Sequence, residues 1–215
     1  MCANGTIRIY IGGTTYVTAS IIPLSSWVHF TLTFNDSSKL ATFYVGGSSV
    51  DTNTMAAGVG ISTRDFTIGK GLSAFFPFDG NIAEPSVWSK ELSLTEVQEI
   101  YNSGVPNNLS THSASANLVS WWRLGGDVSF NTNWNVPDQV ASNDGTSANM
   151  TVDALVGDAP NYSGAGISSN MTINDRVCSA CNSASNAISY NMDKGSVVYS
   201  TPPSTDLTRI LVECR

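Results

Sequence analysis

The sequence predicts an all-β protein, an antiparallel β-sandwich with one short helix, and three observations support this fold class. Only 13% of the 215 residues are charged, whereas Ser, Thr, Asn and Gly are abundant, a composition atypical of helical bundles. Short segments alternate apolar and polar residues with the two-residue period of a strand. Gly-Gly pairs and Asn-Asp turns separate these segments. A chain of this length is sufficient for one sandwich core.

Strands are expected wherever an alternating segment is bounded by turn residues. Residues 6–18 predict a hairpin that turns at Gly12-Gly13, and residues 27–34 and 39–45 predict two longer antiparallel strands. In the first of these longer strands, the apolar residues share one face and the others face solvent or a second sheet: Val28, Phe30, Leu32 and Phe34 against His29, Thr31 and Thr33. Further strands are expected at 64–70, 80–88 and 118–124.

One helix is expected between two of these strands. Ser93 fits the N-cap position, and Glu96 three residues later completes a capping box. Apolar residues recur at helical spacing from Leu94 to Tyr101 until Pro106 ends the pattern. The sequence therefore predicts a short helix near the end of the sandwich.

The chain is expected to divide into three parts. Residues 1–125 carry the sandwich, residues 126–166 form a loop-rich extension, and residues 167–215 form a small Cys-containing C-terminal appendage. Short strands are expected in this appendage at 187–191, 196–200 and 208–213, where apolar residues concentrate.

The four cysteines, Cys2, Cys178, Cys181 and Cys214, are an even number and allow three pairings. Cys178 and Cys181 have the spacing of half a zinc site, but neither a second pair nor a histidine lies at ligand spacing. We expect disulfides, as in proteins exposed to an oxidising medium, and metal binding or free thiols remain the alternatives.

Charge and hydropathy exclude two classes of partner. The net charge of −7 is unsuited to a phosphate backbone, so we expect no nucleic-acid binding. We also expect no membrane insertion, because no apolar run approaches the roughly 20 residues that span a bilayer. The first residues carry no basic segment followed by a hydrophobic one, so no targeting signal is expected there.

The serial order of several short segments resembles the second half of a laminin-G-like, or concanavalin A-like, jelly roll. These segments are Trp27 with Phe30–Phe34, Phe43–Gly47, Phe66–Gly69, Phe78–Glu84, Val87–Ser93 with Glu96, and Ile100–Gly104. The resemblance covers about residues 5–125 and implies two packed antiparallel sheets with one short helix. Residues 118–149 are in addition similar to a stretch found in predicted structural proteins of marine phages.

The chain departs from this family pattern at its start. A complete domain of this kind carries several strands before the one that begins near Gly5, and this chain has none there. Three explanations are open: the chain is a fragment, residues 118–215 fill the gap by permutation, or a neighbouring subunit donates strands to open edges.

We expect no catalytic residues. Glycosidases use two carboxylates that face one another across the scissile bond. Here Asp79 and Glu84 would point to opposite faces of a regular strand. Neither His29 nor His112 lies near a Gly-x-Ser-x-Gly elbow, so a serine-hydrolase arrangement is not expected either.

The sequence requires no cofactor, although the resemblance implies that calcium can bind at an edge of the sandwich. Carboxylates in turns supply the hard oxygen ligands that this ion prefers. The candidate ligands are Asp36, Asp79 and Asp144, each of which also fits as a turn-forming residue.

Exposed aromatic rings can stack on the apolar face of a sugar. Trp27, Trp88, Trp121 and Trp122 are expected in the core. Trp134, which lies between two asparagines, is the expected exposed candidate for a glycan site, with Tyr16 and Tyr162 after it. The alternative is that Trp134 attaches its loop to the body of the protein.

These expectations favour binding and assembly over catalysis. We expect a virion structural or surface protein, such as a capsid decoration or tail-fibre component, located on the virion surface or outside a cell. Its partners would be identical or other virion subunits, in a homo-oligomer for example, and a host or environmental polysaccharide. The alternative function is that of a secreted lectin-like carbohydrate-binding module.

Overall fold

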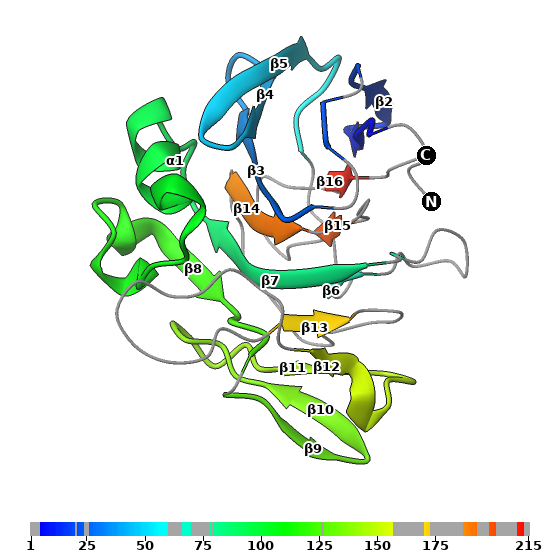
Figure 1. The fold of residues 1–215 in the computed structure, drawn as a ribbon. Coiled ribbons are helices and arrows are strands. Elements are labelled where there is room, and N and C mark those ends of the chain that lie inside the picture. The colour runs from blue at the N-terminus through cyan, green and yellow to red at the C-terminus, as the bar shows by residue number, and fades with distance from the viewer. Residues whose placement is uncertain are drawn as a thin grey trace.

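The computed structural model of the chain describes most of its first three quarters and four strands beyond them. The described residues are 5–19, 21–23, 26–59, 66–69, 78, 80–125, 127–156, 170–172, 187–192, 198–200 and 210–212. They form β-strands, one α-helix and short 3-10 turns, so the expected all-β fold class with one short helix is confirmed (Figure 1).

The largest sheet has eight strands and forms one layer of the molecule. Its order is β12-β13-β7-β14-β3-β4-β5, and β8 also pairs with β7. All of the pairs are antiparallel. The strands are β3 (Val28–Asn35), β4 (Leu40–Val45), β5 (Ser48–Thr54), β7 (Asn81–Trp88), β8 (Leu118–Trp121), β12 (Leu155–Val156), β13 (Asn170–Thr172) and β14 (Ala187–Met192).

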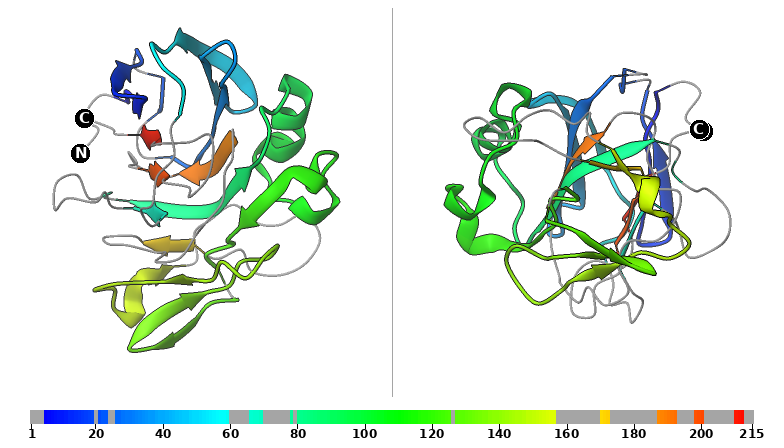
Figure 2. Two further views of the ribbon diagram at one scale, coloured as in Figure 1. Left: turned by 180° about the vertical axis from the view of Figure 1, so that it is seen from behind. Right: turned by 60° about the horizontal axis from the view of Figure 1, so that its bottom comes forward.

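Three smaller sheets surround this layer, as the three views in Figures 1 and 2 show. The expected first hairpin is confirmed as β1 (Arg8–Ile11) paired with β2 (Thr14–Val17). The second sheet joins β9 (Ser129–Asn131), β10 (Asn133–Val136) and β11 (Gly145–Thr146). The third joins β6 (Thr67–Ile68), β15 (Val198–Ser200) and β16 (Ile210–Val212).

The main core lies between the eight-stranded sheet and the smaller sheets. From β3 it takes Phe30, Leu32 and Phe34, each fully buried, as the alternation of this strand predicts. The opposing side is supplied by the β1–β2 hairpin, β6 and β10, from which Ile7, Ile9, Ile11, Ile68, Trp134 and Val136 are also buried. This arrangement of two layers around one apolar core is that of a β-sandwich.

The opposite face of β3 is also buried. His29, Thr31 and Thr33 were expected to face solvent or a second sheet, but each of them is buried. A second cluster of buried apolar residues is separate from the main core. This cluster contains Tyr44, Trp88, Leu92, Val97, Ile100, Leu109, Ala114, Leu118 and Trp121. Helix α1 (Leu94–Tyr101) contributes Val97 and Ile100 to it, and the Tyr101 ring centroid lies 5.5 Å from that of His29, so the helix packs on this side, where solvent or a second sheet was expected (Figure 1).

The expected capping box defines the start of α1. The Ser93 hydroxyl accepts a hydrogen bond from the Glu96 N–H, and the Glu96 carboxylate accepts one from the Ser93 N–H. The helix ends at Asn102, whose backbone is left-handed, and the short turns η1 (Asn102–Gly104), η2 (Leu109–Thr111) and η3 (Ser115–Asn117) lead to β8. A fourth turn, η4 (Val152–Ala154), precedes β12.

The C-terminal part of the chain is not an appendage. Its three expected strands are present, and the first of them, β14, lies in the centre of the main sheet between β3 and β7. Residues far apart in the sequence are therefore neighbours in space (Figure 1). Local alternation could not predict this position, because strand pairing over such a distance depends on the whole sheet.

β14, which lies between β3 and β7, is supplied by the same chain, whereas the three explanations for the family pattern near Gly5 stay predictions. Among the residues that the structure describes, no helix has the length and apolar character needed to cross a membrane.

Candidate functional site

The expected glycan ligand Trp134 is not exposed, which corrects the first candidate site. Its side chain is buried on β10, where the burial of Asn133–Val136 alternates outward, inward, outward, inward. The Trp134 indole N–H donates a hydrogen bond of 2.8 Å to the carbonyl oxygen of Thr151. The Asn-Trp-Asn-Val sequence is thus a strand with alternating faces, and Trp134 attaches it to the body of the protein.

The aromatic side chain that this hairpin exposes is Phe130 on β9. Its side chain is 39% exposed and its ring centroid lies 5.1 Å from that of Trp134. The two rings belong to directly paired positions of β9 and β10. Directly paired residues share one face of a sheet, so partial exposure of Phe130 beside buried Trp134 places Phe130 at the margin of that face, on a separate hairpin from the pocket described below.

Tyr16 is half-buried and contributes to packing between β2 and the main sheet. Its hydroxyl donates a hydrogen bond of 2.9 Å to Asp51 Oδ2 on β5, and its ring lies 5.8 Å from that of Phe43. Burial, and then the neighbouring Asp51 carboxylate, raise the pKa of the Tyr16 phenol. Tyr162 lies outside the described residues.

Two of the three candidate calcium ligands are described, and each has a partner within the protein. Asp36 accepts a hydrogen bond from the Val59 N–H and forms an ion pair of 3.1 Å with Lys39. Asp144 accepts a hydrogen bond of 2.9 Å from the Asp138 N–H. Within the described ranges, no three His, Cys, Asp or Glu side chains are grouped as metal ligands. Asp79 and all four cysteines lie outside these ranges, so the calcium and disulfide expectations stay predictions.

Glu84 has a structural partner on each of its carboxylate oxygens. Trp121 Nε1–H donates to Oε2 at 2.6 Å, and Arg123 Nε lies 3.7 Å from Oε1. The Glu84 side chain is almost fully buried and its backbone has a φ of 57° within β7. The residue therefore holds β7 and the end of β8 together, at the point where the register of β7 with β14 shifts between Ala83 and Ser86.

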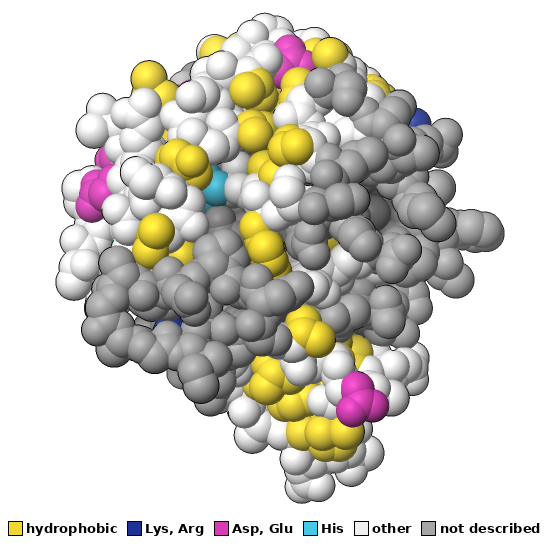
Figure 3. All heavy atoms as spheres, viewed as in Figure 1, with side chains coloured by type: hydrophobic (Ala, Val, Ile, Leu, Met, Phe, Trp, Pro, Cys, Tyr) yellow, Lys and Arg dark blue, Asp and Glu magenta, His cyan; other side chains and the backbone are white. Residues whose placement is uncertain are grey.

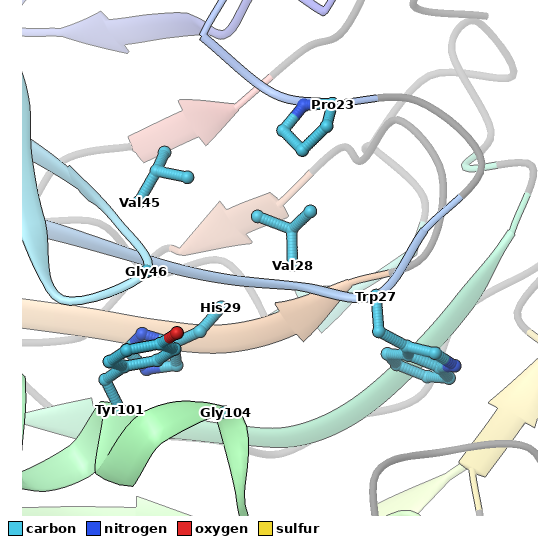
Figure 4. Close-up of a pocket in the computed structure, with 8 residues that line it drawn as sticks. All are labelled: Pro23, Trp27, Val28, His29, Val45, Gly46, Tyr101 and Gly104. Carbon is cyan, nitrogen blue, oxygen red and sulfur yellow. The ribbon is translucent and has the colours of Figure 1, made fainter.

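A pocket of about 240 Å³ opens where four segments of the fold meet (Figure 4). They are the residues before β3, the start of β3, the β4–β5 turn and the end of α1. The lining residues are Pro23, Trp27, Val28, His29, Val45, Gly46, Tyr101 and Gly104. In Figure 4 the Trp27 ring and the paired Tyr101 and His29 rings stand at opposite sides, with Val28 and Pro23 between them.

The lining of this pocket is uncharged. None of its described residues is acidic, lysine or arginine, and burial lowers the pKa of His29 to about 3. The loss of hydration disfavours the imidazolium form, so His29 is neutral at physiological pH. The face seen in Figure 3 likewise carries many hydrophobic and neutral side chains and only scattered charged ones.

Tyr101 is positioned by glycines of the β4–β5 turn. A Cβ on Gly47 would lie 2.8 Å from Tyr101 Cδ1, which is closer than real contacts allow. Gly47 also has a φ of 72°, in the left-handed region that favours glycine. On its other side, the Tyr101 ring centroid is 5.5 Å from that of His29. This packing fixes one aromatic wall of the pocket.

Sequence reasoning missed the residues of this pocket. Trp27 was expected in the core, but its side chain is half-buried and lines the pocket just before β3. The sequence predicts an apolar helix position for Tyr101. It predicts that His29 lies on the face of its strand that points toward solvent or a second sheet. The Gly46-Gly47 pair after an aromatic strand was the one local signal, because it permits a ring to lie against the turn.

No curated protein and no solved structure matches the chain. A family model does match its first part, over residues 2–98. That range contains β1 to β7 and most of α1, including Trp27, His29 and Val45 of the pocket. The matching model is Laminin_G_3 of the concanavalin A-like lectin/glucanases superfamily, so the resemblance to this jelly-roll class is confirmed over residues 2–98.

Proposed function

We propose that the chain is a non-enzymatic surface protein of a virus particle, a capsid decoration or tail-fibre component, which binds one ring of a neutral glycan. The observation that carries the binding part is the uncharged pocket with Trp27 on one side and Tyr101 on the other. Its surroundings are a β-sandwich whose matched family includes lectins by name.

A sugar ring suits this pocket in size and polarity. The volume of about 240 Å³ is below the ~300–1,000 Å³ of pockets for drug-sized ligands, so it suits a single ring. The C–H face of a pyranose stacks on indole or phenol rings, while its hydroxyls need a few polar groups at the rim. Tyr101 supplies a hydroxyl, and the turn at Gly46 supplies main-chain groups.

Binding without catalysis is supported by the placement of Glu84 and by the pocket itself. The Glu84 carboxylate is engaged by Trp121 and Arg123, and no carboxylate is among the described residues that line the pocket. Glycoside hydrolysis requires an acid and a base or nucleophile at the bound sugar. We therefore propose adhesion to a polysaccharide.

The virion setting is supported by the similarity of residues 118–149 to marine phage structural proteins. Assembly is supported by the edge strand β5, whose outer edge has no paired strand among the described residues. Such an edge can pair with another subunit. The second candidate is a secreted lectin-like module, for which the same pocket would serve.

The binding test is a titration of neutral oligosaccharides, selected on a glycan array, against Trp27→Ala. Loss of one stacked ring should weaken binding at least tenfold, which corresponds to about 1.4 kcal/mol. Phe130→Ala is the matched control, because this exposed aromatic residue lies on the β9–β10 hairpin outside the pocket. Equal affinities of Trp27→Ala and the unchanged chain would reject the pocket as the glycan site.

The solution mass separates the two settings. Light scattering with and without calcium should give a calcium-independent oligomer for a virion component, against 22.8 kDa for one chain. A stable monomer that loses glycan binding on calcium removal would instead support the secreted lectin-like module.

A further inference from the structure

The pocket of the proposed function has two chemically different sides. In Figure 4, Pro23, Val28 and Val45 stand on one side of the β3 ribbon, and none of their side chains carries a polar atom. His29 and Tyr101 stand on the other side, with an imidazole and a phenol hydroxyl. A ligand that fills both sides must itself have an apolar part and a polar part.

The apolar side of the pocket is the end of the main core. Val28 is 7% exposed and belongs to the core, and the partly buried Val45 packs against it. β3 begins at Val28 and β4 ends at Val45, so the core reaches the pocket at this point. The Gly46 N–H of the adjoining turn donates to the His29 carbonyl oxygen at 3.0 Å, so this donor is already engaged. A polar ligand group against the two valines would therefore lose its hydration without a side-chain partner.

The charge of the chain restricts the ligand further. No Lys or Arg is among the described residues that line the pocket, and the whole chain has a net charge of −7. A carboxylate or sulfate group would therefore enter without a cation among these residues to pair with, and against the overall charge of the protein. Uronic acids and sulfated sugars are disfavoured, which leaves neutral rings.

We infer that the neutral ring is a 6-deoxyhexose, whose methyl group packs against Val28 and Val45 while its ring hydroxyls lie on the side of Tyr101. Such a sugar has a methyl group where an ordinary hexose has a hydroxymethyl group, so one edge is apolar and the opposite edge carries hydroxyls. An N-acetylated sugar also has a methyl group, but its amide N–H and C=O are directly beside it and would lie against the valines. This inference rests on the proposed function and names the sugar class for its pocket.

The test compares sugars that differ by one hydroxyl group. The pairs are the methyl glycosides of L-fucose and L-galactose, of L-rhamnose and L-mannose, and of D-fucose and D-galactose. Calorimetric titration of the full-length chain should show about ten- to hundredfold tighter binding of at least one 6-deoxy sugar than of its hydroxylated counterpart, the range by which an apolar pocket rejects an added hydroxyl group. The methyl glycoside of N-acetylglucosamine is titrated alongside them.

Two valine variants locate the methyl group. Val45→Thr keeps the shape of the side chain and adds a hydroxyl that can bond the extra ligand hydroxyl, so the preference for the 6-deoxy sugar should fall about fivefold. Val50→Thr is the matched control and should keep the preference, because Val50 is 42% exposed on β5 and lies outside the pocket. Both substitutions place threonine in a strand, where it is well accommodated.

The possible outcomes separate the sugar class from the binding site. Equal affinities within every pair, for sugars whose binding Trp27→Ala still weakens, would overturn the 6-deoxy preference and keep the proposed function. Tighter binding of the N-acetylated sugar would overturn the preference as well. A 6-deoxy preference that Val45→Thr leaves unchanged would contradict the packing of the methyl group on the apolar side. If no neutral sugar binds at all, the proposed function fails and this inference fails with it.

Discussion

Lowering the pH should destabilise the protein through His29, because the folded chain buries this side chain in its neutral form. Burial lowers the pKa of His29 from 6.5 to about 3, so the unfolded chain takes up a proton first as the pH falls. Stability is then lost as the pH drops below the unfolded value of 6.5, at about 1.4 kcal/mol for each unit. Between about pH 7.5 and pH 5 the loss from this one residue is about 2 kcal/mol.

The assay is urea unfolding followed by tryptophan fluorescence at both pH values, with His29→Phe as the comparison. The variant keeps an aromatic ring near Tyr101, whose ring centroid is 5.5 Å from that of His29, but it cannot take up a proton. The loss of stability on acidification should be smaller by about 2 kcal/mol in the variant, while all other titrating groups cancel. If His29→Phe does not fold, His29→Gln serves the same purpose. Equal losses in the variant and the unchanged chain would refute the reasoning.

Three further predictions concern single side chains. Gly47→Ala should cost about 2–4 kcal/mol in urea unfolding, because its Cβ would collide with Tyr101 in addition to the strain of a positive φ. Gly13→Ala is the matched control and should cost only about 1 kcal/mol, because it has the φ strain but its Cβ would make only an ordinary contact, 3.9 Å from the Tyr10 hydroxyl. Ser93→Ala removes the helix cap and should lower the unfolding free energy by about 1 kcal/mol; no change would show that the capping box contributes nothing. Trp134→Ala should lower the free energy of unfolding by about 3–5 kcal/mol, because the side chain is buried. Glycan affinity, measured under conditions in which the variant is folded, should stay the same. A selective loss of affinity would show that Trp134 belongs to the binding site.

The local elements of the fold could be predicted because the sequence encodes them over short distances. The strand at residues 28–34, the Gly12-Gly13 turn and the Ser93 capping box each depend on neighbours within a few positions, and the structure confirms all three. The burial of both faces of β3 could not be predicted in the same way. Thr31 and Thr33 fit an outward-facing side of a strand in the sequence, and their burial is set by segments distant in the chain.

The candidate site was less predictable than the fold, because a pocket is made by segments that meet only in the folded chain. Trp27 and Tyr101 lie far apart in the sequence, and the serial order of segments that contains both does not show that they line one pocket. Trp134 shows the converse difficulty: its polar neighbours suggested an exposed loop, whereas the same Asn-Trp-Asn-Val pattern is a strand with its indole turned inward. The pairing of β14 was equally hidden, since it depends on residues about 100 positions earlier.

The central position of β14 also determines how long the edges of β3 and β7 stay unpaired during synthesis. Its partner β7 leaves the ribosome about 100 residues before Ala187 does, and its partner β3 about 150 residues before. At about 5–20 residues per second, both edges stay open for about 5–20 s in every new chain. The nascent protein therefore holds an aggregation-prone pair of strand edges that its own β14 must reach before a strand of another molecule does.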